Sequence, residues 1–222
     1  MTSKFLTNDD VEIFKNFIIE NNFVQQYPHW LWNNYNSDIM LKWGGILKYV
    51  KSVSDKNSII LDLACGDSPV PKIISNWCKE IHSFDAYKNQ SSIDNFKFFS
   101  GNHIQFLNNI QENLYDIVYD SCSSIHFDVS HNESNQIYNN GFYYTLQKVK
   151  YSLKPNGKFF IICDCGNHEC GEIFKASNMH KMIENVDFKF LGDVNLDKPK
   201  NIFTWSNPME LNVVSFSLTK NQ

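Results

Sequence analysis

An apolar run that stops in a turn of small residues constrains this chain most. The segment Ile59–Leu63 is almost wholly apolar, which favours a strand buried on both faces of a parallel sheet. Ala64 and Gly66 then remove side-chain bulk, so a ligand could approach the backbone closely. Ser68 is suited to cap the helix that follows. Asp62 is therefore expected near the carboxyl end of the strand, where open α/β sheets bind ligands.

The length and composition of the chain indicate a single folded domain. A chain of 222 residues, of which 42% are hydrophobic and 15% aromatic, can bury a sizeable core. No apolar run reaches the roughly 18 residues that cross a membrane. Residues 1–10 also lack the apolar stretch of a signal peptide. We therefore expect one domain over residues 1–222, cytoplasmic and without a membrane partner.

The charge of the chain indicates which partners to expect, and its cysteine content indicates the redox state of the thiols. The net charge is −4, and all 20 basic residues are lysines. Arginine is the usual bidentate ligand of phosphate and of guanine edges, and the sequence has no basic stripe, so we expect no nucleic-acid partner. The six cysteines lie in a chain without a secretion signal, which favours reduced thiols over disulfides.

Strand and helix patterns alternate along most of the chain. Patterns typical of strands occupy residues 58–63, 81–85, 96–100, 115–120, 158–163, 188–194 and 211–218. Helical spacing predicts helices over 10–21, 37–53, 68–78, 103–109, 139–153 and 176–185. The alternation implies a mostly parallel sheet that ends in an antiparallel edge pair. Residues 1–55 are expected to form a helical cap on an α/β core of residues 56–222.

Two polar corners follow the first strand. Asp85 ends the second strand about twenty residues after the glycine turn, where a carboxylate can accept hydrogen bonds from ribose hydroxyls. A capping aspartate would occupy the same place, and both nicotinamide and methyl-donor folds put an acid there. Gly101 and Asn102 end the third strand. The amide oxygen of Asn102 suits either an adenine amino group or the cap of the next helix.

Two later segments complete a set of four motifs. Residues 114–120 read LYDIVYD, and residues 154–161 read KPNGKFFI. With the glycine turn and Asp85, in this order and spacing, they resemble the class I S-adenosylmethionine-dependent methyltransferases over about residues 58–218. Asn102 and Asn156 stand where that family commonly has an acid and a glycine.

The resemblance implies both a fold and a cofactor. The fold is a Rossmann-like α/β fold, with a seven-stranded, mostly parallel sheet, an antiparallel edge strand and an N-terminal helical cap. S-adenosyl-L-methionine would lie across the carboxyl ends of strands one to four, under the cap, and leave as S-adenosyl-L-homocysteine. The implied cofactor-binding residues are Asp62, Ala64, Gly66, Asp85, Ala86, Gly101, Asn102, His103, Asp120 and Ser121. The implied activity is methylation of a small molecule.

The segment after strand four is where the family transfers the methyl group, and it contains His126 and Asp128. Transfer mainly requires a lone pair aligned with the methyl group, and a hydroxyl acceptor also needs a base. Histidine titrates near neutrality, so His126 is the candidate base, with Asp128 or His131 to orient it. A structural role for His126 is the alternative. We expect a hydroxyl acceptor first and an amine next.

Other functions remain open at this stage. A nicotinamide oxidoreductase would favour G-x-G-x-x-G after strand one, which this turn lacks. A methyltransferase-like domain could bind cofactor or a partner without catalysis. A protein or RNA methyltransferase would be favoured by a basic groove or by an N/D-P-P-Y/F/W motif. Strand four ends in the sequence DSCS, residues 120–123, so that motif is missing.

Three segments each allow two interpretations. Residues 163–170 hold three cysteines and a histidine in a spacing unlike a standard zinc site, which favours a polar loop near the substrate over a metal site. A divalent cation between Asp120 and Asp164 is a further alternative, but the expected site includes no metal. Aromatic residues 27–35 either pack the cap or wall the substrate pocket. Residues 200–205 form either a lid or a packed connection.

Overall fold

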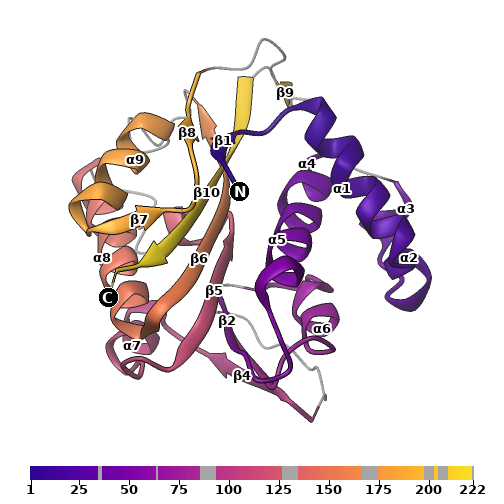
Figure 1. Cartoon of the computed structure of the whole chain (residues 1–222). Coiled ribbons are helices and arrows are strands. Elements are labelled where there is room, and N and C mark those ends of the chain that lie inside the picture. The colour runs from indigo at the N-terminus through magenta and orange to yellow at the C-terminus, as the bar shows by residue number, and fades with distance from the viewer. Residues whose placement is uncertain are drawn as a thin grey trace.

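A single sheet runs through the computed structural model, and helices cover both of its faces (Figure 1). The structure describes residues 1–34, 37–63, 65–85, 94–126, 135–166, 175–197, 203–204 and 210–221. Within them ten strands join the sheet in the order β4-β3-β2-β5-β6-β10-β1-β8, and β7 and β9 also pair with β10. None of the helices in these ranges has the length and apolar character needed to cross a membrane.

Parallel strands form one side of the sheet and its centre. They are β4 (Phe96–Ser100), β3 (Glu80–Asp85), β2 (Ile59–Leu63), β5 (Tyr115–Ser121) and β6 (Leu153–Gly166). Strand β2 is apolar on both faces because Ile60 packs toward the N-terminal helices and Leu61 toward the opposite helical layer. Because all five strands run in the same direction, the residues that follow them meet at one edge of the sheet.

The other side of the sheet is mixed, with mainly antiparallel pairs and a parallel pair of β1 with β8, and it holds more strands than the seven-stranded sheet that was expected. Strand β10 (Glu210–Lys220) pairs antiparallel with β6 and with β7 (Phe188–Phe190), which confirms the expected terminal pair. However, β10 is not at the edge. The strands β1 (Ser3–Phe5), β8 (Val194–Asn195) and β9 (Phe203–Thr204) extend the sheet beyond it. These strands are two or three residues long, too short to show the alternation by which a strand is recognised.

Two helical layers enclose the sheet (Figure 1). One contains α1 (Asn8–Glu20), α2 (Phe23–Gln26), α3 (Trp30–Asn33), α4 (Ser37–Ile39), a π-helix (Met40–Gly44), α5 (Gly45–Val53) and α6 (Val70–Ile74). The other contains α7 (His103–Asn108), α8 (Asn135–Ser152) and α9 (Ala176–Asn185). The helix expected over 37–53 is thus present but interrupted by the π-helix, and the helix expected over 68–78 is shorter. The division into cap and core stays a prediction.

Two adjacent glycines bring the π-helix and α5 close to the sheet. A Cβ added at Gly44 would lie 2.9 Å from Cβ of Phe14 on α1. A Cβ added at Gly45 would lie 2.5 Å from Cδ1 of Ile162 on β6. Real Cβ atoms do not approach this closely, so a larger residue would force Phe14 to shift at position 44 and the end of the Ile162 side chain to shift at position 45. This close contact places Lys42, on the same π-helix, beside the end of β6.

Candidate functional site

Three buried carboxylates lie at the carboxyl ends of neighbouring parallel strands. Asp62 on β2, Asp85 on β3 and Asp120 on β5 are 2%, 7% and 0% exposed. Burial, together with the negative charges of Asp120 and Asp85, raises the pKa of Asp62 well above its usual range. The nearby hydroxyl groups of Tyr119 and Ser83 act in the opposite direction and lower that pKa. Burial thus disfavours the charged carboxylate, and a cationic ligand bound beside these carboxyl groups would favour it again, so the site suits such a ligand.

The turn after β2 is joined directly to Asp85. The backbone N–H of Gly66 donates to Oδ2 of Asp85 over 2.7 Å. Gly66 has φ +52°, in the left-handed region that favours glycine. A Cβ added there would meet no atom of the described residues within 4 Å, so on their side the space beside this glycine is open. A ligand can thus approach this backbone closely, as the small residues of the turn suggest.

The corner after β4 has a similar opening. Gly101 has φ +136°, and a Cβ added there would also meet no atom within 4 Å. The N–H of Gly101 donates to the carbonyl of Asp85 over 3.3 Å. The side-chain oxygen of Asn102 accepts from Ile104 N at 2.9 Å and from Gln105 N at 3.2 Å, and so caps α7, which begins at His103. The amide therefore serves as a helix cap, and its adenine role stays a prediction.

Asp120 organises the loop after β5. Its carboxylate accepts from Ser123 N at 2.8 Å, from Ser124 N at 3.1 Å and from the Ser124 hydroxyl. Burial raises the pKa of Asp120 to about 6, although these donors favour the charged form. The carboxylate thus fixes the start of the short 3-10 helix Ser124–His126, which carries the candidate base.

Of the other expected site residues, the structure describes only some. Ser121 ends β5, and its hydroxyl is buried without a hydrogen-bond partner in the described part of the chain. Ala64, Ala86 and Asp128 lie outside the described residues, as does the side chain of His126. The structure therefore gathers Asp62, Gly66, Asp85, Asp120, Ser121 and the Gly101–His103 corner at one edge of the sheet.

A second polar cluster at this edge was not expected from the sequence. Nζ of Lys42, on the π-helix, lies 2.7 Å from Oδ2 of Asp164 on β6 and 3.0 Å from Oδ1 of Asp38 on α4. Sγ of Cys122 lies 3.3 Å from the same Asp164 oxygen. Burial acts to lower the pKa of Lys42, but Cys122 and the carboxyl groups of Asp164 and Asp38 together hold it above its usual range. A lysine inside the apolar run Met40–Leu47 was the one available signal for it.

The cysteines of β6 face away from this cluster. Cys163 and Cys165 are buried in the core under α9, where Sγ of Cys163 lies 3.8 Å from Sδ of Met179. Burial raises the pKa of both thiols, that of Cys165 to about 12. Residues 167–174, with the rest of the cysteine-rich loop, lie outside the described residues. In the described ranges no group of three or more His, Cys, Asp or Glu side chains is arranged so that it could hold a metal ion.

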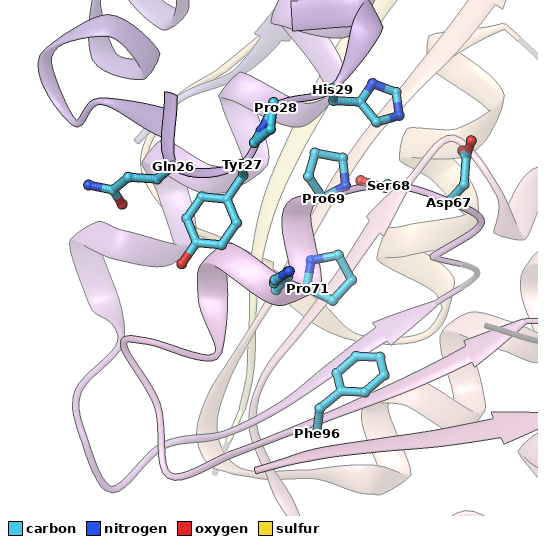
Figure 2. A pocket seen from close by; sticks show the side chains of 10 residues that line it. Gln26, Tyr27, Pro28, His29, Asp67, Ser68, Pro69, Pro71 and Phe96 are labelled. Carbon is cyan, nitrogen blue, oxygen red and sulfur yellow. The ribbon is translucent and has the colours of Figure 1, made fainter. Parts of the chain in front are cut away.

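The aromatic segment packs the N-terminal helices at one position and lines a cavity at two others, and its role at the substrate pocket stays a prediction. Trp32 is fully buried and packs edge-on against Trp43, with ring centroids 5.6 Å apart. Tyr27 and His29 instead line a cavity of about 410 Å³ together with Asp67 from the turn after β2 (Figure 2). The segment expected as a lid, residues 200–205, is described only at Phe203–Thr204, where its backbone forms β9.

A second cavity, of about 440 Å³, lies at the opposite, amino-terminal ends of the strands. His82 lies in its wall, with Nδ1 2.9 Å from the Tyr115 hydroxyl and Nε2 2.6 Å from Oε1 of Glu80. Lys97 also pairs with Glu80. Since these polar groups are paired with one another, the network reads as structural support for the amino ends of β3 and β5.

The chain is similar to known proteins in fold but matches none of them by sequence. No family model matches the chain, and no curated protein matches its sequence. Solved structures do match its fold. The 1,6-didemethyltoxoflavin-N1-methyltransferase of Burkholderia thailandensis, solved with S-adenosylhomocysteine, is 11% identical with a TM-score of 0.59, over 93% of this chain and 89% of that one.

Two other matches show how widely this fold is used. The N-methyltransferase NodS of Bradyrhizobium japonicum is 10% identical with a TM-score of 0.59, over 84% of this chain and 98% of that one. The cyclase SpnF is 10% identical with a TM-score of 0.58, over 95% of this chain and 94% of that one. The chain therefore has the Rossmann-like fold of the class I methyltransferases, as its four motifs predict.

Proposed function

We propose that the protein transfers a methyl group from S-adenosyl-L-methionine to a small-molecule acceptor. The observation that carries the proposal is the trio of buried carboxylates Asp62, Asp85 and Asp120 at neighbouring strand ends. The ligand would bring an ammonium, a sulfonium and a ribose diol, which are groups that carboxylates bind well. The open backbone at Gly66 and Gly101 leaves room for it beside those carboxylates. The residues present thus fit this cofactor.

Different residues would bind different parts of the cofactor. Asp85, held by the Gly66 N–H, would accept hydrogen bonds from the ribose hydroxyls, and Asp62 would face the positively charged groups of the ligand. When bound, S-adenosyl-L-methionine supplies an electrophilic methyl group, which an acceptor lone pair attacks as the carbon–sulfur bond breaks and its electrons stay on sulfur. The protein's part is to align the acceptor, exclude water and remove the acceptor's proton.

The residues that would act on the methyl acceptor are proposals as well. Asp120 fixes the 3-10 helix that leads to His126, so a base at His126, oriented by Asp128, would stand on a rigid support. Such a base would take up the proton that a hydroxyl or an ammonium acceptor must lose. A chain with no arginine and a net charge of −4 supports a small acceptor rather than a nucleic acid.

A second candidate is a domain that binds the cofactor or a partner without methyl transfer. The match to the cyclase SpnF favours it, since it shows the same fold in a protein named for another reaction. The two candidates differ in one observable: only a methyltransferase converts S-adenosyl-L-methionine into S-adenosyl-L-homocysteine when an acceptor is added.

Calorimetric titration tests the proposal. We expect S-adenosyl-L-methionine and S-adenosyl-L-homocysteine to bind with micromolar affinity, and NADH not to bind. The Asp85→Ala variant should weaken binding of both methyl-donor ligands by about tenfold or more, because a charged hydrogen bond to the ribose is lost. The matched control is Asp187→Ala, an exposed aspartate 3.0 Å from Lys150 on the far side of the fold. Binding of NADH alone, or of none of the three, would overturn the proposal.

A further inference from the structure

The cluster around Lys42 joins three separate parts of the chain at the acceptor side of the site. Lys42 is 8% exposed, and its ammonium group bridges Asp38 and Asp164. Cys122, the first residue after β5, places its Sγ 3.3 Å from both the backbone N and Oδ2 of Asp164. Burial raises the pKa of Cys122, so the thiol is neutral. Two carboxyl groups therefore face one ammonium. With both ionised the cluster has a net negative charge, although burial raises the pKa of Asp38.

One oxygen of Asp164 has no partner. Oδ2 is bonded to both Lys42 and Cys122, whereas Oδ1 is buried and accepts no hydrogen bond from any described residue. A buried carboxylate oxygen without a donor is costly, more so in a cluster that is already negative. The hydroxyl of Ser121 is buried and unpaired in the same way. The structure thus offers an acceptor and a hydroxyl that a ligand could satisfy.

Ser121 and Asp164 lie on the same face of the sheet. Ser121 is paired in register with Ile162 on the neighbouring parallel strand, and Asp164 lies two residues further along β6. Side chains two residues apart on a strand point to the same face, so Asp164 projects beside Ser121 and toward the π-helix. Asp62 is on this face too, since its register partner Tyr119 lies two residues before Ser121. The unpaired oxygen therefore borders the proposed methyl-donor site.

We propose that Asp164 selects the acceptor, and that the acceptor is a small-molecule amine whose N–H group hydrogen-bonds to Oδ1. This inference rests on the proposed function and names the substrate class of that site. A hydroxyl could also donate to Oδ1, but a net negative charge on Asp38, Lys42 and Asp164 attracts an amine, which carries positive charge in water. The ammonium group gives up one proton to solvent, its lone pair then attacks the methyl group as the carbon–sulfur bond breaks, and a remaining N–H stays on Oδ1. The same charge repels carboxylate and phosphate compounds. Lys42 holds Asp164 in place and is a positioning residue.

The test compares amines with alcohols of the same shape. The pairs are butylamine with butanol, 2-phenylethylamine with 2-phenylethanol, and tryptamine with tryptophol, each titrated by calorimetry into protein saturated with S-adenosyl-L-homocysteine. We expect at least one amine to bind about tenfold more tightly than its alcohol. In Asp164→Asn, which keeps the shape and removes the charge, the preference should disappear. Thermal unfolding of the variant checks that it is folded.

The matched control is Asp116→Asn. Asp116 also pairs with a lysine, Nζ of Lys154, over 2.7 Å, but it lies near the amino-terminal end of β5. This variant should keep the amine preference. Equal binding of amines and alcohols, a preference that persists in Asp164→Asn, or no amine binding below about 10 mM would each overturn the inference. Failure of the proposed function is seen separately, because binding of S-adenosyl-L-homocysteine is measured before each amine or alcohol titration. If the protein does not bind S-adenosyl-L-homocysteine, the amine and alcohol pairs are titrated into the protein without it.

Discussion

At the scale of single residues, the burial of Asp120 makes the stability of the protein depend on pH. Its pKa is about 6 in the folded protein, against an ordinary value of 3.8. Between about pH 4 and pH 6 the unfolded chain has released this proton and the folded chain has not, so stability falls as pH rises through that window. We expect Asp120→Asn to remove this part of the decline, which amounts to about 3 kcal/mol. Urea unfolding of both proteins at either end of the window measures it.

The control for that experiment is the same change at an exposed carboxylate. Asp187 pairs with Lys150 at the surface, so Asp187→Asn should leave the pH dependence between those limits nearly unchanged. If the wild type and Asp120→Asn lose stability in parallel over this range, Asp120 does not carry the raised pKa.

Lys42 is expected to matter more for stability than a surface lysine. In Lys42→Met, the buried carboxylates of Asp38 and Asp164 lose their shared counter-ion, which costs about 3–5 kcal/mol when a buried pair is broken. Adding Asp164→Asn removes one of the unpaired charges, so the double variant should unfold at a higher urea concentration than Lys42→Met alone. Additive losses in this double-mutant cycle would show that the two residues do not interact.

At the scale of elements, the contact between α5 and β6 sets the position of the π-helix. The Gly45→Ala variant would force its Cβ against Cδ1 of Ile162, and overpacking of this kind costs about 1–3 kcal/mol. Ile162→Val removes that Cδ1 atom, so the double variant Gly45→Ala/Ile162→Val should regain most of the loss. Chemical denaturation of the three variants checks this. A double variant no more stable than Gly45→Ala would place the strain elsewhere.

The sequence was most informative where an element is long and its apolar pattern regular. Strand β4 spans Phe96–Ser100 and helix α9 spans Ala176–Asn185, both as expected from spacing and breakers. The π-helix was not expected, because the apolar spacing of residues 37–53 fits an ordinary α-helix. The glycine pair at the end of this turn packs against α1 and β6, a tertiary contact that no local sequence pattern reports.

At the scale of the whole molecule, the two halves of the site differ in how well the sequence predicts them. Asp62, Gly66 and Asp85 follow strand ends, and parallel topology alone brings them together. The pairing of Lys42 with Asp164 joins residues 122 positions apart and depends on how the N-terminal helices settle on the sheet. The methyl-donor side was therefore predictable from motifs, whereas the acceptor side needed the structure.

The sheet also ties the start of the described chain to its end. Strand β1 pairs antiparallel with the middle of β10, where Lys4 is in register with Ser215 and Phe5 with Val214. Deletion of residues 1–5 would leave that stretch of β10 without its partner and expose an edge that can pair with another chain. We expect a lower free energy of unfolding and concentration-dependent self-association in light scattering. Lys4→Ala, which loses only the 2.7 Å ion pair with Asp10, should stay monodisperse and lose less stability. If the deletion behaved like Lys4→Ala, β1 would contribute no more than that ion pair, and the extended edge would be dispensable to the fold.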